Sequence, residues 1–207
     1  MNIWVEEFGD NYQLRNTASY KEVINRKHLW YKILCRDDIR FYSHLRASIN
    51  SIFEIGAGAG ANLLAINDID PKIKLECSEV NKYARDKLLD NPFISDTYSD
   101  TSDVEDMYDL VFTYGVLIHI HPKDLKSCMI KMYNLSNRYI LFCEYFRPEA
   151  TPLLYRGKQG ELWGNDFGKV FIKMYGKKVK CIDNGFLWKE TTGLDNITYW
   201  LFEKVSC

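Results

Sequence analysis

A chain of 207 residues with a formal net charge of −1 lacks the basic excess that nucleic-acid binding normally requires. Its hydrophobic content of 46% and charged content of 27% are those of an ordinary globular protein, and its length suits a single domain with a full core. No run of apolar residues approaches the ~20 that span a bilayer. We therefore expect neither a nucleic acid nor a membrane as a partner.

The cysteines are scattered and form no Cys-x-x-Cys pair: Cys35, Cys77, Cys128, Cys143, Cys181 and Cys207. This pattern favours free thiols in a reducing compartment over a disulfide framework. The N-terminus has no basic segment followed by an apolar one, so no signal peptide is expected. The sequence thus predicts a cytoplasmic protein without a metal site.

Residues 1–48 are expected to form an N-terminal arm followed by helices, and residues 49–207 an α/β core in the same domain. The arm itself, residues 1–16, has no clean period but mixes aromatic and polar residues, as a lid or packing strap often does. Apolar residues recur at helical spacing over 18–35, and a second short helix is predicted around 37–48.

Residues 51–64 then form an apolar run that ends in an acid and is followed by three glycines at alternate positions. The pattern predicts a buried parallel strand that turns sharply into a helix over 61–69. Glycines at such a turn allow positive φ and let a ligand approach the backbone N–H groups that open the helix. The candidate cofactor-binding residues of this stretch are Glu54, Gly56, Ala57, Gly58, Gly60 and Asn62.

Two classes of cofactor use such a turn. Gly56, Gly58 and Ala61 satisfy the dinucleotide spacing G-x-G-x-x-G/A. The longer pattern E-x-G-x-G-x-G, which begins at Glu54, resembles more closely the turn of Rossmann-like enzymes that bind S-adenosylmethionine (SAM). An acid facing the loop repels a pyrophosphate but suits the cationic amino-acid end of SAM. SAM is therefore the preferred cofactor, with an NAD-dependent oxidoreductase and a SAM-binding protein without catalysis as alternatives.

The second predicted strand, 73–80, also ends in an acid. Glu79 lies about twenty residues beyond the glycine turn, where a Rossmann-type fold places an acid on the ribose hydroxyls of its ligand. Glu79 and the neighbouring Val80 are therefore further candidates for cofactor binding.

A helix over 81–90 is followed by a weak third strand over 93–99. The end of that strand should lie beside the adenine, which nominates Tyr98 and Ser99. The acidic tract 100–109 is predicted to be a solvated loop.

The stretch YDLVFTYGVLIHIHP, residues 108–122, predicts a buried strand that runs into a loop, with Pro122 in the first turn of a helix over 122–135. Tyr114 and Gly115 should border the cofactor. His119 is the leading candidate for a general base, because it follows the strand and an imidazole titrates near neutrality. The alternative is a histidine that only shapes the loop. His121 is interpreted as a cap or exposed residue that could also contact the acceptor.

A further strand over 138–144 ends in Glu144, followed by Tyr145. Both should lie across the same pocket, with Glu144 orienting or deprotonating the acceptor and Tyr145 forming a wall. Residues 146–160 are predicted to form a loop. In it, Tyr155 and Arg156 are the candidate anchor for an anion, since arginine makes paired hydrogen bonds to carboxylate or phosphate.

Two residues of the N-terminal arm, Tyr12 and Arg15, could close over the methionine end of SAM. After a helix over 162–175, the chain closes with two strands over 179–188 and 196–205. Alternating αβ units that end in a hairpin predict a mostly parallel sheet with one reversed strand.

Together, the glycine turn, Glu79, the stretch at 108–122 and the terminal hairpin resemble the class I SAM-dependent methyltransferases, which have a Rossmann-like fold. More narrowly, the chain is similar to the pseudaminic acid biosynthesis-associated methylases. That similarity covers nearly the whole chain and is carried by W…EEFGDNY…RN, GVLIHI, EYF with YRG and DFG, and DNGFLW…DNITYWLFEK.

The resemblance implies methyl transfer from SAM to a small-molecule acceptor, an anionic sugar or nucleotide sugar of surface-polysaccharide (nonulosonic acid) biosynthesis. The sequence predicts no particular oligomeric state.

Overall fold

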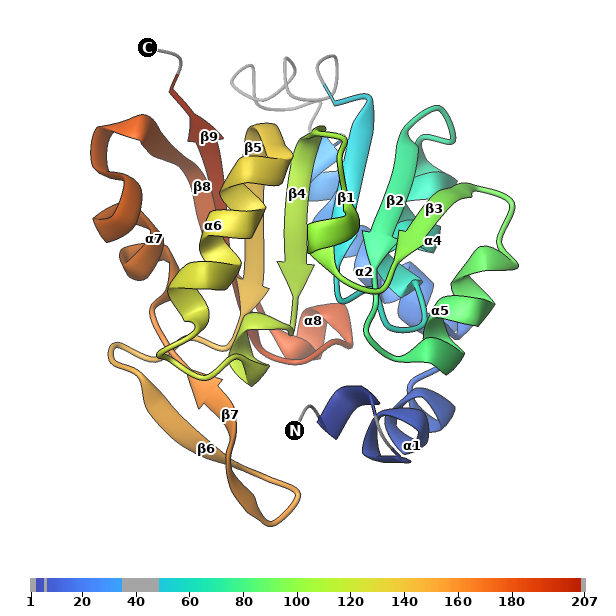
Figure 1. The fold of residues 1–207 in the computed structure, drawn as a ribbon, viewed down its shortest axis with the longest axis horizontal. Helices are drawn as coiled ribbons and strands as arrows, with labels where there is room; N and C mark the ends of the chain where they lie inside the picture. Colours follow the sequence, from blue (N-terminus) through green and yellow to red (C-terminus); the bar gives the residue numbers. More distant parts are fainter. Residues whose placement is uncertain (1–2, 6, 35–48, 206–207) are drawn as a thin grey trace.

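The computed structural model describes residues 3–5, 7–34 and 49–205. Its centre is a seven-stranded sheet in the order β3-β2-β1-β4-β5-β9-β8 (Figure 1). The strands are β1 (Ser51–Ile55), β2 (Lys74–Ser78), β3 (Ile94–Tyr98), β4 (Tyr108–Tyr114), β5 (Ser136–Glu144), β8 (Val179–Leu187) and β9 (Ile197–Lys204). Within this sheet only β9 is reversed, because it pairs antiparallel with both β5 and β8 while the other pairs are parallel. The predicted α/β fold class and its C-terminal antiparallel hairpin are confirmed.

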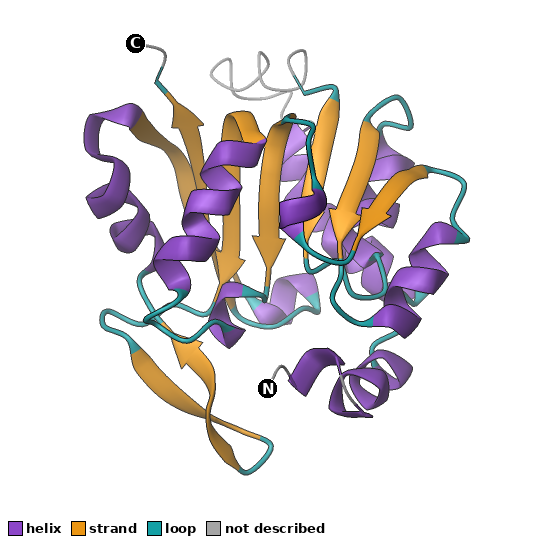
Figure 2. Ribbon diagram, in the orientation of Figure 1, coloured by secondary structure: helices purple, strands orange, loops and turns teal. Residues whose placement is uncertain are grey.

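Helices lie on both faces of the sheet (Figure 2). The helical segments are η1 (Ile3–Val5), α1 (Glu7–Arg15), α2 (Tyr20–Leu34), α4 (Ala61–Ile69), α5 (Lys82–Leu89), η2 (Thr101–Asp103), η3 (Leu117–His119), α6 (Leu125–Leu135), α7 (Phe167–Tyr175), η4 (Gly176–Lys178) and α8 (Lys189–Thr192). Among the described helices, none is long and apolar enough to cross a membrane.

The central strands alternate their side chains between two apolar cores. In β1, Ile52 packs with the core that includes α2 and α4, whereas Phe53 packs with the core that includes α6 and α7. In β4, Phe112 packs in the core with α2 and α4, and Val111 packs in the core with α6 and α7. Since both faces are covered, these strands are apolar at nearly every position, which made them recognisable in the sequence.

One predicted loop is wrong. Residues 146–160 contain β6 (Thr151–Tyr155) and the start of β7 (Lys158–Gly164), which form a separate two-stranded sheet. The turn between them has positive φ at both central residues, Arg156 (50°) and Gly157 (77°), as a type I′ hairpin turn requires. Such turns usually contain Asn-Gly or Asp-Gly, so the Arg-Gly pair concealed this one.

Because β7 extends to Gly164, the helix predicted over 162–175 begins only at Phe167. The side chain of Asp166 caps it by accepting the N–H of Lys169 at 2.9 Å. Helix α4 has the predicted bounds, and the other predicted elements are present with shifted ends. The helix expected around 37–48 lies outside the described residues.

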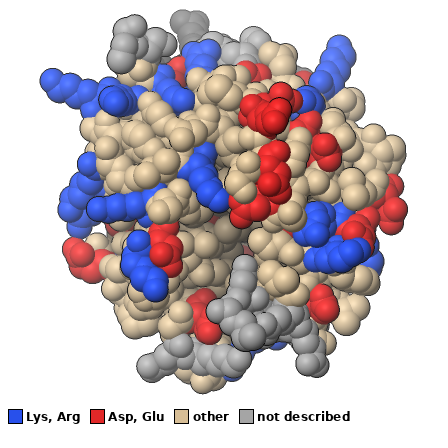
Figure 3. All heavy atoms as spheres, viewed as in Figure 1, with Lys and Arg blue, Asp and Glu red and all other residues tan. Residues whose placement is uncertain are grey.

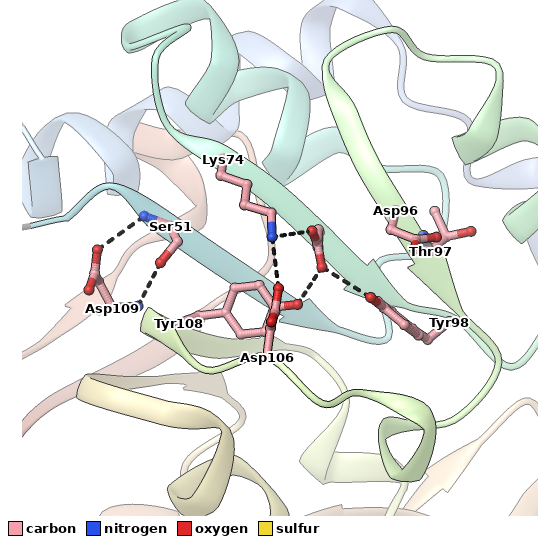
Figure 4. Close-up of polar contacts among 9 residues, drawn as sticks. Ser51, Lys74, Asp96, Thr97, Tyr98, Asp106, Tyr108 and Asp109 are labelled. Carbon is pink, nitrogen blue, oxygen red and sulfur yellow. Dashed lines mark hydrogen bonds and ion pairs between the residues drawn. The ribbon is translucent and has the colours of Figure 1, made fainter.

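Between β3 and β4 a polar cluster ties three strands together (Figure 4). Glu76 on β2 is 3% exposed and accepts hydrogen bonds from the hydroxyls of Tyr98 on β3, at 3.3 Å, and Tyr108 on β4. Lys74 lies 2.7 Å from the same carboxylate and 2.9 Å from that of Asp106. A buried carboxylate with several donors is costly to disrupt, because removing it leaves those donors unpaired.

Charge of both signs covers the outside of this region. On the face shown in Figure 3, acidic residues gather above and to the right of centre, and basic residues lie on the left, along the upper edge and in a group at the right. Most residues of the acidic tract at 100–109 are exposed, as predicted, including Asp103, Glu105 and Asp106.

We predict that Glu76→Ala lowers the free energy of unfolding by about 3 kcal/mol, because it leaves two tyrosine hydroxyls without their acceptor. Asp106→Ala is the matched control: its side chain is 64% exposed, so the loss should stay below about 1 kcal/mol. Chemical denaturation measures both. Equal effects would mean that Glu76 does not hold the three strands together.

Candidate functional site

A cavity of about 870 Å³ lies beyond the carboxyl ends of β1, β2 and β4. The strand order reverses here, since β1 lies between β2 and β4, and open α/β sheets bind ligands at such points. The N-terminal segment and the loop after α8 complete its walls. Residues that line it include Trp4, Tyr12, Gln13, Arg26, Glu54, Gly56, Ala57, Gly58, Glu79, Val80, Ser99, Tyr114, Gly115, His119, His121, Lys189 and Asp195.

The predicted glycine turn forms the floor of the cavity. Gly56 has φ 72°, and a Cβ there would lie 2.7 Å from Val116, so both conformation and space require glycine. The N–H groups of Gly56 and Ala57 donate to the carbonyl of Ser78 at 2.8 and 3.1 Å. Gly60 instead caps α4 and packs toward Leu88, away from the cavity.

Glu79 holds this turn in place. One carboxylate oxygen accepts the N–H of Gly58 at 2.7 Å and the other accepts the N–H of Asn81 at 2.8 Å. Asn81 in turn donates to the carbonyl of Trp4 and to Asp10, which fastens the N-terminal segment to the core. Burial raises the pKa of Glu79, and these hydrogen bonds oppose the rise. Glu79 also lines the cavity, so its carboxylate can meet a ligand there.

Glu54, the acid at the end of β1, is 1% exposed. Its Oε1 accepts a hydrogen bond from Asn62 at 2.7 Å, and Asn62 accepts one from Trp30 at 3.3 Å. Its Oε2 is buried and has no hydrogen-bond partner among the described residues. Burial raises the pKa of Glu54 to about 8, although Asn62 and the charge of Arg26 act in the opposite direction.

Arg26 on α2 is a site residue that the sequence did not reveal. Its guanidinium lies 3.8 Å above the ring of Tyr114, and its Nε and Nη1 are buried with no acceptor in the described part of the chain. The hydroxyl of Tyr114 and the Oε1 of Gln13 are also buried and have no hydrogen-bond partner among the described residues. Arg15, predicted for this role, ends α1, and its side chain lies outside what the structure describes.

His119 lies in η3 and faces the cavity. Its Nδ1 is 2.9 Å from the carbonyl oxygen of Glu161. Its ring packs edge-on against Trp4, with centroids 4.6 Å apart, and against Tyr155, at 5.2 Å. Burial lowers the pKa of His119. His121 is exposed, and its Nδ1 accepts the N–H of Lys123 at 3.2 Å.

The structure corrects the expectation that Glu144 contacts the acceptor. Its carboxylate is fully buried behind the loop that follows β4 and accepts the N–H groups of Val116, Leu117 and Ile118 at 3.1–3.3 Å. Burial raises its pKa to about 7 against these hydrogen bonds. Glu144 therefore shapes the loop that carries His119.

Four other predicted residues lie outside the cavity. The hydroxyl of Tyr145 donates to Asp195, which does line the cavity, at 2.8 Å. Tyr98 points to Glu76, Tyr155 packs against His119, and Arg156 is exposed at the hairpin turn. Their positions depend on which way a side chain leaves its strand or turn, and the sequence pattern did not settle this.

Several lining residues belong to segments interpreted otherwise in the sequence. Asp100 and Thr101 line the cavity although they begin the acidic loop, and Ser127 and Lys131 reach it from α6. Within the described residues, no group of three or more His, Cys, Asp or Glu side chains could hold a metal ion.

No protein-family model matches the chain, and no curated protein matches it by sequence. Solved structures match its fold. One is magnesium protoporphyrin IX methyltransferase from Synechocystis PCC 6803 with bound S-adenosylhomocysteine (SAH), with a TM-score of 0.70 and 10% identity over 98% of this chain and 97% of that chain.

Two further structures extend the comparison. The 1,6-didemethyltoxoflavin-N1-methyltransferase of Burkholderia thailandensis, with bound 1,6-didemethyltoxoflavin and SAH, has a TM-score of 0.67 and 10% identity over 98% of this chain and 86% of that chain. The N-terminal domain of EvdMO1, in the presence of SAH and D-fucose, has a TM-score of 0.57 and 10% identity over 91% and 84%. These similarities establish the class I methyltransferase fold. They do not establish the narrower family.

We predict that Glu54→Gln reduces the pH dependence of stability. The pKa of Glu54 is higher in the folded chain than in the unfolded chain, so wild-type stability should fall as pH rises from about 4.5 toward 8. The glutamine side chain of the variant keeps an acceptor for Asn62 and carries no charge. The free energy of unfolding of the variant, relative to that of the wild type, should therefore rise by at most about 1.4 kcal/mol per pH unit across this window.

Glu144→Gln is the contrasting variant, because it places an amide NH₂ against backbone N–H donors and should destabilise the protein at pH 5. Since the pKa of Glu144 is raised to about 7, this loss of stability should become smaller as pH rises toward 7. Denaturation of the ligand-free protein between pH 5 and 8 compares the two. A wild-type protein that does not lose stability relative to Glu54→Gln would contradict a buried, proton-binding Glu54.

Proposed function

We propose that this chain is a SAM-dependent methyltransferase that acts on a small molecule. The observation that carries the proposal is a set of buried polar atoms, on residues that line the cavity, with no hydrogen-bond partner among the described residues: Nε and Nη1 of Arg26, Oε2 of Glu54, the Tyr114 hydroxyl and the Gln13 amide oxygen. Unpaired donors and acceptors are costly in a folded protein unless a ligand pairs with them. The amino-acid end of SAM carries a carboxylate for Arg26 and an ammonium for Glu54.

The rest of the cavity fits the nucleoside end. The carboxylate of Glu79 can accept the ribose hydroxyls, and Val80 and Ser99, which also line the cavity, can border the adenine. When bound, SAM supplies a sulfonium methyl group for in-line displacement. Burial keeps Glu54 protonated near neutral pH in the ligand-free chain, and the ammonium group of SAM would favour its ionised form. A dinucleotide fits less well, because its pyrophosphate offers no cation for Glu54.

In this proposal His119 is the general base that takes the proton of the acceptor. It lines the cavity, and its Nδ1 is engaged by a carbonyl, which leaves Nε2 to act. Because burial lowers its pKa, the ring is neutral and able to accept a proton near pH 7. Trp4 and Tyr12 cover the cavity from the N-terminal segment and would limit the access of water.

A sugar acceptor remains part of the proposal. Aromatic rings at Trp4 and Tyr12 suit the apolar face of a sugar ring, and a fold relative was solved in the presence of D-fucose. The predicted anion anchor, Arg156, lies outside the cavity, so an acidic group on the acceptor would meet Lys189 instead. Acidic side chains outnumber basic ones around the cavity, which favours a sugar with few negative charges over a nucleotide sugar: Glu22, Glu54, Glu79, Asp100, Asp124 and Asp195 against Arg26, Lys131 and Lys189.

We predict that Arg26→Leu raises the Kd of SAM and of SAH by roughly 10- to 150-fold, the value of about 1.5–3 kcal/mol for hydrogen bonds to a charged group. Lys27→Leu is the matched control, because Lys27 pairs with Asp68 at 2.8 Å outside the cavity. Calorimetric titration of both folded variants measures the effect. Equal affinities would remove Arg26 from the cofactor site.

We also predict that His119→Asn lowers kcat by ~10²-fold or more while leaving the Kd of SAM nearly unchanged. The wild-type rate should fall on the acidic side of a pKa below 6.5, and this limb should disappear in the variant. The assay is transfer of labelled methyl from SAM into a metabolite extract, and then into the isolated product. His28→Asn, at an exposed position on α2 outside the cavity, is the control. Full activity of His119→Asn would leave His119 with a structural role only.

A further inference from the structure

Segments from outside the seven-stranded sheet converge on His119. Trp4 comes from η1, Tyr155 from β6, and the carbonyl of Glu161 from β7. Tyr155 and Glu161 belong to the β6–β7 hairpin, which forms a sheet of its own and projects beyond the end of the main sheet (Figure 1). Such a hairpin is marginally stable alone. It is anchored where Leu162, only 6% exposed, joins the core beside η3.

The hydrogen bond from His119 has a definite direction. A carbonyl oxygen can only accept, so Nδ1 must carry the hydrogen in the contact with Glu161. A neutral imidazole has one N–H, and therefore Nε2 must hold the lone pair. The two aromatic rings fix the plane of the imidazole, which keeps Nδ1 directed at the carbonyl.

We propose that the β6–β7 hairpin positions His119 and fixes its tautomer, so that Nε2 is the nitrogen available to accept a proton in the cavity. Glu161, through its main-chain carbonyl, and Tyr155, through its ring, are the positioning residues. The catalytic use of this tautomer rests on the proposed function, but the tautomer itself does not. The hairpin thus has a chemical role.

Among the groups around His119, the hydrogen bond to the Glu161 carbonyl is the feature that selects the tautomer. The titratable groups that face the ring come from the hairpin, namely the carboxylate of Glu161 and the phenol of Tyr155. Trp4, on the other side, carries no charge. A negative Glu161 favours the protonated ring slightly, whereas burial disfavours it more.

His121 provides an internal reference two positions along the chain. Its Nδ1 faces the backbone N–H of Lys123 at 3.2 Å, and an N–H can only donate. Nδ1 of His121 is therefore the acceptor, and its neutral ring must carry the hydrogen on Nε2. The two histidines should have opposite tautomers under the same conditions.

The experiment is long-range ¹H–¹⁵N NMR on the full chain with ¹⁵N-labelled histidine, at neutral pH and without added ligand. The His119 and His121 signals are assigned with His119→Gln and His121→Gln. We expect Nδ1–H in His119, with a slowly exchanging proton, and Nε2–H in His121. A His119 ring that is protonated on Nε2, or that exchanges between both forms, would overturn the proposal.

A second comparison tests the contribution of the hairpin. Tyr155→Leu should convert His119 to a mixture of tautomers, whereas Leu154→Ala, on the same strand and 70% exposed, should leave it unchanged. A single Nδ1–H form in Tyr155→Leu would overturn the role of the ring. The NMR experiment contains neither SAM nor an acceptor, so its result stands even if the chain proves not to be a methyltransferase. Conversely, finding His119 as the Nε2–H tautomer would not contradict binding of SAM.

Discussion

The site depends on the paired hydrogen bonds that the carboxylate of Glu79 accepts from the backbone. One bond fixes the glycine turn at Gly58, and the other fixes the start of α5 at Asn81. Asn81 then carries the constraint to the N-terminal segment through Trp4 and Asp10. A single buried acid thus sets the floor of the cavity and holds its cover, because charge-assisted hydrogen bonds are stronger than neutral ones.

Three buried glutamates around the cavity differ in how far they are satisfied, and this difference locates the ligand. Both oxygens of Glu79 and of Glu144 accept backbone N–H groups, so these acids organise loops. Glu54 has a single partner, Asn62, and an oxygen without one among the described residues. Arg26 has the opposite need, because its buried Nε and Nη1 donors have no acceptor among the described residues. Acceptor and donor remain unpaired in one cavity, which is the expected pattern for a site that pairs them with a ligand of both charges.

The sequence was most informative where local chemistry decides the structure. Alternate glycines and continuous apolar runs predicted the turn, helix α4 and the parallel strands, since these patterns have few other uses. The sequence was least informative where the structure depends on which way a side chain points from its strand or helix. Glu144 lies at the predicted strand end, yet its carboxylate turns toward loop N–H groups. Arg26 is one charged residue in an amphipathic helix, and nothing in its spacing distinguishes it from a surface arginine. The hairpin was missed because Arg156 occupies a turn position that favours Asn, Asp or Gly.

The central claim is that the cavity binds the zwitterionic end of SAM. The most direct measurement is calorimetric titration of the wild-type chain with SAM, SAH, NAD⁺ and NADH in turn. The account predicts one site for SAM and for SAH, with no detectable binding of either nicotinamide cofactor. Binding of NAD⁺ without binding of SAM would contradict it, because the cavity would then select a pyrophosphate over the amino-acid end that Arg26 and Glu54 are proposed to bind.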